Sequence, residues 1–364
     1  MKDKLLFCLL VVGIIFQSNI SAQPVENLFF ITLDGLRWQE LFSGADAMLI
    51  TETEYVKDTQ ALKDQFWRIT PEERRATLLP FFWNTIAQEG QIYGNRNLGN
   101  KMNCSNIFWF SYPGYAELLV GETNAKVIHS NEKVLNPDTT FLEYLNRSSS
   151  FKDQVASFCS WDVFPFIINE PRSNIPVNAG FEPVAGHDLN ERESFLNLLQ
   201  EEIPSPWSTV RLDAFTHHFA MEYVQKHHPR VLYLAYGETD DFAHDGRYDH
   251  YLSSAHRTDA WIYELWQMVQ SDSFYRHKTA FVITTDHGRG RYEEGAWKSH
   301  GKTYEGSDAI WLAVLGPGIV GKGEVTEKQQ LWQRQVAGTC LQILGLETWI
   351  KEDMGKAIDL TVKR

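Results

Sequence analysis

Residues 278–291 read KTAFVITTDHGRGR, and they decide the fold that we predict. Apolar and β-branched side chains run through residues 280–285, which predicts a buried strand. A carboxylate, an imidazole and a glycine follow at once, at Asp286, His287 and Gly288. Gly288 lets the backbone turn, so two side chains that would point to opposite sides of a strand can converge. We therefore expect this strand to end at a functional site.

The rest of the chain alternates apolar runs with segments of helical spacing. Further strands are predicted at Asn27–Leu33, Val155–Cys159, Val231–Tyr236 and 309–315, and helices at 79–89, 112–120, 139–145, 212–227 and 255–269. Such alternation predicts an α/β fold, a doubly wound and mostly parallel sheet with helices on both faces. Residues 42–75 and 169–206 are charged or rich in Pro, Asn and Glu, and we expect loops or small caps there, over one rim of the sheet.

Composition restricts the classes of partner. The chain has 364 residues, of which 43% are hydrophobic, and this is enough for one large core. We predict a single catalytic domain over residues 23–364. The net charge of -13 gives no basic surface for nucleic acid, so an anionic substrate would have to be attracted locally, by cations such as bound metal.

The first residues predict export. Two lysines precede an apolar run from Leu5 to Phe16, and a polar stretch then ends in Ser21-Ala22. This layout is typical of a secretory signal peptide, here residues 1–22, although an N-terminal core helix is the alternative. We expect a periplasmic or extracellular protein, and no later apolar run is long enough for a transmembrane segment in the mature chain.

Two other predicted strands also end in acids. LFFITLDG ends at Asp34, and VLYLAYGETDD runs into Asp240, with His244 four residues later on the same face of a helical turn. Ligands of open α/β sheets bind at this carboxyl edge. Three acids there would repel one another, and because imidazoles accompany them, a metal ion is the natural counter-charge. His300 stands in a loop between two glycines and is a further candidate ligand.

Each of these features has a structural alternative. Asp34 before Gly35 can be a turn former or a helix cap, and Asp240 with His244 can be the start of a surface helix. We favour a site because the features occur together. Six other histidines fall in helical or charged segments and are expected to be solvated or locally hydrogen-bonded: His217, His218, His227, His228, His250 and His256.

Ser111 is the candidate nucleophile. Residues 103–121 read NCSNIFWFSYPGYAELLVG, with Ser111 at the start of a predicted helix. A serine there is by default an N-cap. The same place offers free backbone N–H groups and the positive end of the helix dipole, which suit a phosphate, and metal coordination would activate the hydroxyl. Both interpretations stay open at this point.

The ordered set Asp34, Ser111, Asp240-x-x-x-His244, Asp286-His287 and His300 resembles the alkaline phosphatase superfamily. The resemblance is closest to the branch of type I phosphodiesterases and nucleotide pyrophosphatases, with VITTDHG and D-x-x-x-H its most specific parts. It implies two divalent metal ions, zinc by preference and manganese as the alternative. By this resemblance one metal ion would be held by Asp240, His244 and His300, and the other by Asp34, Asp286 and His287, with Ser111 as the nucleophile beside the second ion.

The chain also departs from that pattern. The diesterase branch has a TFPNH-like segment where this chain has SYPGY, so Gly114 and Tyr115 alter the surroundings of Ser111. Asn131 lies near the distance at which the family has a phosphate-binding Asn. Formylglycine sulfatases need Arg where Tyr115 stands, which disfavours that class. Arg37, Lys298 and Lys302 are weaker candidates for phosphate contacts.

These observations predict an exported two-metal hydrolase of phosphate monoesters or diesters that forms a phosphoserine at Ser111. The substrate would be a small-molecule phosphate ester. Three alternatives stay open: a sulfatase-like enzyme, a phosphoglycerate-mutase-like enzyme, and an inactive protein that binds anions or glycans.

Overall fold

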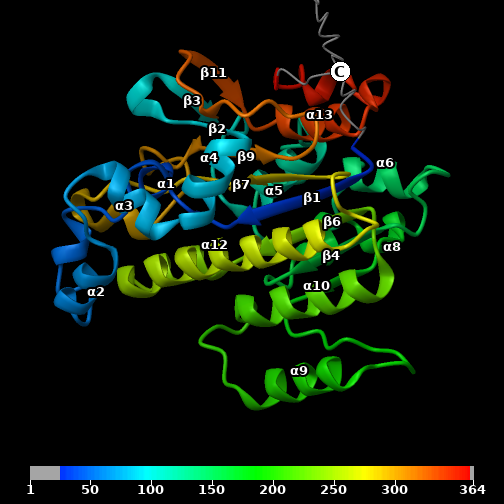
Figure 1. Ribbon diagram of the computed structural model, residues 1–364, viewed down its shortest axis with the longest axis horizontal. Helices are drawn as coiled ribbons and strands as arrows, with labels where there is room; N and C mark the ends of the chain where they lie inside the picture. Colours follow the sequence, from blue (N-terminus) through cyan, green and yellow to red (C-terminus); the bar gives the residue numbers. More distant parts are fainter. Residues whose placement is uncertain (1–24, 361–364) are drawn as a thin grey trace, which may run out of the picture.

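The computed structural model describes residues 25–360 and contains one large sheet with helices on both faces (Figure 1). The order of the eight strands is β10-β2-β9-β7-β1-β6-β4-β5. Their bounds are β1 Asn27–Leu33, β2 Gln91–Tyr93, β4 Val155–Cys159, β5 Val177–Ala179, β6 Val231–Tyr236, β7 Thr279–Thr284, β9 Leu312–Leu315 and β10 Gly323–Glu324. A smaller sheet of order β11-β3-β8 is built from β3 Asn100–Asn103, β8 Ala309–Ile310 and β11 Gln329–Trp332.

The centre of the large sheet is parallel. Strand β1 pairs in parallel with β6 and β7, so that Leu28 lies opposite both Val231 and Ala280. Strands β4 and β5 continue the parallel order, whereas β9 is antiparallel to β7 and β2. Every residue of β1, β6 and β7 is buried, as expected for parallel strands covered on both faces. The predicted α/β class with a mostly parallel sheet is confirmed.

Alternate residues of β1 pack into two separate cores. Phe29 and Ile31 belong to the core beneath α10 and α12, and Phe30 belongs to the core beneath α5, α6 and α13. In Figure 1, α12 and α10 lie on one side of β1 and α13 lies on the other. The helices that cover the two faces are α5 Ser111–Val120, α6 Phe141–Arg147, α10 Asp213–His227, α12 Tyr248–Ser271 and α13 Gln335–Ile343.

The remaining α-helices have between 3 and 12 residues. They are α1 Trp38–Ser43, α2 Thr59–Phe66, α3 Pro71–Leu78, α4 Ala87–Glu89, α7 Phe164–Ile167, α8 Glu170–Ser173, α9 Glu191–Glu202 and α11 Glu238–His244. The predicted helix over 79–89 contains a π-helical segment, Phe82–Ile86, before α4. Carboxylate oxygens of Asp259 accept the backbone N–H groups of Phe81 and Phe82 at the start of this segment.

Two sequence-based boundaries were wrong. Residues 309–315 form two strands rather than one, because the chain passes from β8 in the small sheet to β9 in the large sheet at Trp311. Residues 169–206 are more than a cap: β5 is the edge strand of the large sheet, and α9 packs against α10 on the outside of the fold (Figure 1). A strand of three residues after Pro176 is too short to show a period in the sequence.

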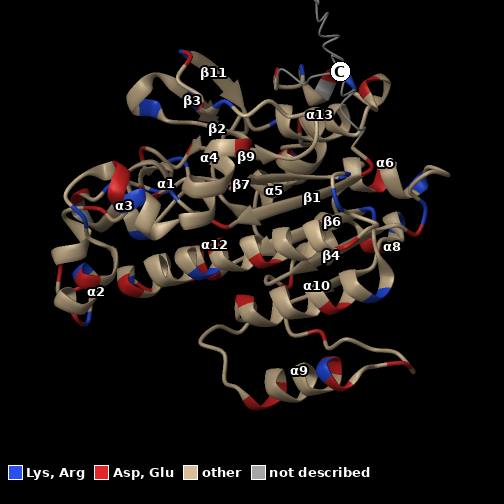
Figure 2. Cartoon of the chain, in the orientation of Figure 1, with Lys and Arg blue, Asp and Glu red and all other residues tan. Residues whose placement is uncertain are grey.

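The described residues carry their charges in a mixed pattern. Lys and Arg positions are scattered over the fold among Asp and Glu positions (Figure 2). No helix within residues 25–360 combines the length and the apolar character needed to cross a bilayer. Cys104, Cys159 and Cys340 are buried free thiols. The predicted signal peptide, residues 1–22, lies outside the described residues.

Candidate metal centre

The carboxyl ends of three neighbouring strands deliver three aspartates to one edge of the sheet. Asp34 follows β1 directly, and Asp286 stands two residues after β7. Asp240 lies in the first turn of α11, which begins after Gly237 at the end of β6. Because β1 lies between β6 and β7, the parallel pairing alone brings the three carboxylates together.

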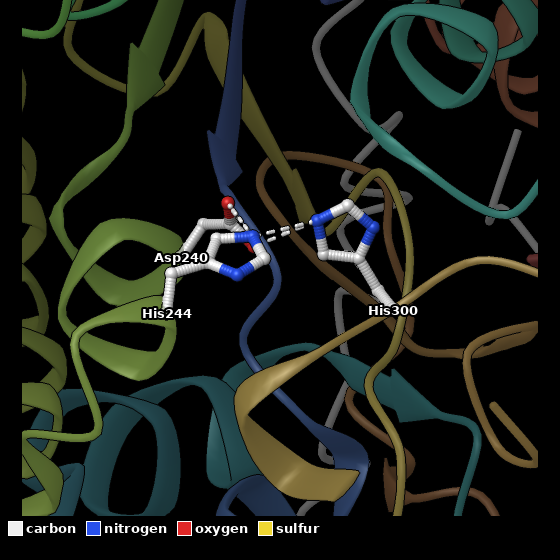
Figure 3. Close-up of side chains that lie close together, drawn as sticks. All are labelled: Asp240, His244 and His300. Carbon is white, nitrogen blue, oxygen red and sulfur yellow. Dashed lines mark hydrogen bonds and ion pairs between the residues drawn. The ribbon is translucent and has the colours of Figure 1, made fainter.

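The six candidate ligands form two groups of three. Asp34, Asp286 and His287 make the buried group, and Asp240, His244 and His300 make the outer group; within each, one ligand atom per residue lies within 4.8 Å of the others. Figure 3 shows the outer group, with Asp240 and His244 both on α11 and the ring of His300 facing them from a separate loop. The structure therefore brings together all six side chains that the sequence singled out.

The two groups adjoin each other at His287. Its Nε2 atom lies 3.3 Å from Asp34 Oδ1, 3.3 Å from Asp286 Oδ2 and 3.9 Å from Asp240 Oδ1. The ring centroids of His287 and His300 are 4.0 Å apart, and His300 Nε2 lies 2.9 Å from His244 Nε2. Ligand atoms of both groups thus converge on one small volume.

A cation fits the buried group. His287 Nδ1 donates to the carbonyl oxygen of Gly288 at 2.8 Å, which leaves Nε2 as the free ring atom facing the carboxylates. Asp34 Oδ1 and Asp286 Oδ2 are buried and have no hydrogen-bond partner, although buried polar atoms are normally satisfied. Carboxylate and imidazole donors of this kind hold zinc or manganese.

The pKa values of Asp286 and His287 are both raised, as expected where buried carboxylates lie close together. Burial and the neighbouring Asp34 carboxylate raise the pKa of Asp286 well above its usual range. Burial alone would lower the pKa of His287, but Asp286 and Asp34 outweigh it and raise that pKa to about 9. A proton on His287 Nε2 would neutralise part of the negative charge of Asp34 and Asp286, and a metal ion bound by the three side chains would do the same. The two are mutually exclusive, because both would occupy Nε2.

Ser111 is the first residue of α5 and is not its cap. Phe110 occupies the N-cap position without a side-chain hydrogen bond, and Ser111 Oγ lies 3.4 Å from His287 Nε2. The structure thus removes the capping interpretation. Asn131 accepts the backbone N–H of Tyr112 through Oδ1 at 2.9 Å, which places its amide at the same helix end.

Comparison with known proteins rests on the fold. No known family profile and no curated protein sequence matches this chain. A 2-O GAG sulfatase superimposes with a TM-score of 0.59 at 12% identity, covering 93% of this chain and 74% of that chain. A mutant of the alkaline phosphatase PafA gives 0.58 at 10% identity, covering 93% and 99%. The fold is that of the alkaline phosphatase superfamily.

A third similar structure is a phosphonate hydrolase. The phosphonate monoester hydrolase of Silicibacter pomeroyi has a TM-score of 0.52 at 14% identity and covers 92% of this chain and 76% of that chain. The similar structures include sulfatases and phosphatases alike. The likeness therefore shows the fold and does not single out the phosphodiesterase branch.

The sequence placed Gly114 and Tyr115 beside Ser111 but did not show the contacts that they make, and it missed Thr239. Tyr115 donates from its hydroxyl to Asp34 Oδ2 at 2.9 Å, and the Thr239 hydroxyl donates to the backbone carbonyl of Asp34 at 2.5 Å. Gly114 brings α5 so close to the turn after β7 that a Cβ there would lie 2.4 Å from the Asp286 carbonyl oxygen. Tyr115 stands four residues after Ser111 on one helix face, which was the only local signal.

Two of the weaker phosphate candidates, Arg37 and Lys298, are engaged in other contacts. Arg37 is buried and paired with Glu40. It lines a cleft of about 620 Å³ together with Arg291, and Arg291 pairs with Glu305. Lys298 lies 5.3 Å from the ring centroid of Tyr55. These basic side chains are matched by acids or aromatic rings and have structural roles.

Proposed function

We propose that this chain is a metal-dependent hydrolase of phosphate esters with Ser111 as its nucleophile, in one catalytic domain over residues 23–364. The observation that carries the proposal is the position of the Ser111 hydroxyl, 3.4 Å from His287 Nε2 and beside two groups of three metal-type ligands. Asp34, Asp286 and His287 would hold one ion, and Asp240, His244 and His300 the other. When bound, two zinc ions, or manganese ions as the alternative, would supply positive charge for the substrate oxygens and lower the pKa of the serine hydroxyl.

The chain itself orients the reaction. Ser111 Oγ lies at the amino end of α5, a helix of 10 residues, where the positive end of the helix dipole stabilises negative charge. Asn131 is fixed through its Oδ1 atom to the N–H of Tyr112, so its amide nitrogen is available to a phosphate oxygen beside Ser111. Tyr115 holds the Asp34 carboxylate in one orientation.

The proposed reaction has two displacements at phosphorus. The Ser111 hydroxyl releases its proton to solvent water and its oxygen bonds to phosphorus, while the bond from phosphorus to the alcohol oxygen breaks and the alcohol leaves with a proton from water. Water then attacks the phosphoserine, the bond from phosphorus to Ser111 Oγ breaks, and the hydroxyl is restored. The ordered motifs make phosphodiesters of the type I phosphodiesterase branch one candidate substrate and monoesters the other.

A sulfate ester is the alternative to these phosphate esters, because a sulfatase is among the similar structures. Against it stands Tyr115, which occupies the place of the Arg in a formylglycine signature and bonds to Asp34 instead. We also propose that the chain is exported, on the strength of residues 1–22, and that its substrate is a small molecule rather than nucleic acid.

The test compares Ser111→Ala with Ser271→Ala, a matched control at the exposed end of α12 whose hydroxyl contacts only the carbonyl of Met268. Each zinc-loaded protein is assayed on p-nitrophenyl phosphate, bis-p-nitrophenyl phosphate and p-nitrophenyl sulfate. We expect S111A to lose on the order of 10³-fold or more in kcat with its zinc retained, and S271A to keep its activity.

Three results would contradict the proposal. Full turnover by S111A would refute the assignment of Ser111 as the nucleophile. Turnover of p-nitrophenyl sulfate alone would favour a sulfatase-like enzyme. Two bound ions without any turnover would favour an inactive anion-binding or glycan-binding protein.

A further inference from the structure

Arg289 is a buried arginine at the metal centre that the proposed reaction does not use. It stands two residues after His287 and is 0% exposed. A guanidinium carries five N–H donors and a fixed positive charge, so complete burial is tolerated only where acceptors surround it. The hydrogen-bond and ion-pair partners of Arg289 therefore indicate its structural role.

The three guanidinium nitrogens contact two separate segments. Arg289 Nη1 forms an ion pair with Asp240 Oδ1 on α11. Its Nε donates to the carbonyl oxygen of Trp297 at 2.8 Å, and its Nη2 donates to the carbonyl oxygen of Lys298 at 2.5 Å. The Arg289 guanidinium thus connects Asp240, a candidate metal ligand, to the backbone of the segment that precedes His300.

The neighbouring backbone strengthens the same link. Gly290 donates its N–H to the carbonyl oxygen of Ser299 at 2.9 Å, immediately before His300. A Cβ at Gly290 would lie 2.4 Å from the carbonyl oxygen of Ala296, so the two segments are in close contact.

The buried group is held by different contacts. Tyr115 orients Asp34, the backbone N–H of Gly35 donates to Asp286 Oδ1 at 3.1 Å, and the Gly288 carbonyl orients His287. None of these contacts involves Arg289. A change at Arg289 should therefore disturb one metal group and leave the other intact.

We propose that Arg289 is a positioning residue that fixes Asp240 relative to His300, so that the outer group is assembled before its metal ion binds. This inference rests on the metal centre of the proposed function. Geometry supports it: Arg289 Nη1 pairs with Asp240 Oδ1, while His244 Nε2 lies 3.1 Å from the other carboxylate oxygen, Oδ2. A lysine would keep the charge, but it lacks the planar fork that reaches both carbonyl oxygens and Asp240 at once.

The test is a Co²⁺ titration of the metal-free protein, followed by the visible absorption of the bound ion and by the metal content. The variants are Arg289→Met, Arg289→Lys and the matched control Arg291→Met, which removes an exposed arginine paired with Glu305. We expect two ions in the unchanged protein and in R291M. In R289M the affinity for one ion should fall about 10- to 100-fold with an altered spectrum, while the second ion keeps its affinity. R289K should lie between the two.

Four outcomes would overturn the inference. One is two ions with unchanged affinities and spectrum in R289M, and another is full recovery by R289K, which would mean that charge alone matters. Loss of both ions in R289M and R289K would mean that Arg289 stabilises the whole fold rather than the outer group. An equal loss of affinity in R291M would mean that the effect is not specific to Arg289. Failure of the unchanged protein to bind Co²⁺ is a separate result, because it would refute the proposed metal centre itself.

Discussion

Substitution of Gly114 by Ala tests whether the close approach of α5 to the turn after β7 sets the geometry of the site. A Cβ at position 114 would lie 2.4 Å from the carbonyl oxygen of Asp286 and 3.0 Å from its carbonyl carbon. Carbon and oxygen atoms in contact are normally about 3.3 Å apart, so one segment has to move by about 1 Å. The side chain of Gln333 donates to the same carbonyl oxygen, and Gly288 donates to the Ser307 carbonyl at 2.8 Å. Because these bonds hold the turn, we expect the helix to move.

The movement has two measurable consequences. Ser111 is three residues before Gly114 in the same helix, so its hydroxyl moves away from His287. A misplacement of about 1 Å costs about 10²-fold in rate, and overpacking costs about 1–3 kcal/mol of unfolding free energy. The assay is kcat/KM of the zinc-loaded protein on p-nitrophenyl phosphate, with unfolding in urea measured in parallel.

Gly338→Ala is the matched control, because Gly338 also stands inside a helix, α13. A Cβ there would meet Cγ2 of Ile350 at 3.3 Å, a side-chain atom that can give way, and the Gly355 carbonyl oxygen at 3.6 Å. We expect G338A to keep its activity and to gain up to about 1 kcal/mol from helix propensity. Unchanged kcat/KM in G114A, or equal losses in both variants, would refute the argument from close packing.

Three further predictions concern other contacts. Tyr115→Phe removes the 2.9 Å hydrogen bond to Asp34 Oδ2, so a Co²⁺ titration should show about 10- to 100-fold weaker binding at the buried group; unchanged binding would contradict this role. Chelation by EDTA should lower Tm, and zinc should restore it, because bound cations stabilise only the folded arrangement of carboxylates; a Tm insensitive to both would argue against a metal centre. Asp259→Asn tests a buried carboxyl whose pKa is raised by burial from 3.8 to about 7. The folded protein keeps this proton up to about pH 7 whereas the unfolded chain releases it near pH 4, so this group makes the unfolding free energy fall as pH rises between those values. The Asn amide nitrogen cannot accept one of the two N–H groups that Asp259 holds, so D259N should lose stability by an amount that does not depend on pH. Its unfolding free energy should nevertheless rise relative to that of the unchanged protein as pH increases from 4 to 7, by up to a few kcal/mol in urea unfolding, and equal slopes would refute the assignment.

The sequence by itself determined the sheet and the candidate ligands nearest to it. Asp34 and Asp286 stand at the ends of long apolar runs, and each run is buried on both faces, so its hydrophobicity marks it without any tertiary knowledge. Parallel pairing then places such strand ends at one edge of the sheet. Asp240 and His244 share a helical turn, and a spacing of four residues is enough to place them on one face.

Only the tertiary structure decided the contacts between distant segments. His300 was a weak candidate in the sequence because nothing local shows that its loop brings it to 2.9 Å from His244. Tyr115 and Asp34 are 81 residues apart, and Arg289 and Asp240 are 49 residues apart, so no periodicity connects them. The edge strand β5 was missed for a related reason, since three residues carry too little pattern and their pairing with β4 supplies the order. Local patterns specify the elements, whereas the contacts that orient the site arise only when the packed chain brings remote residues together.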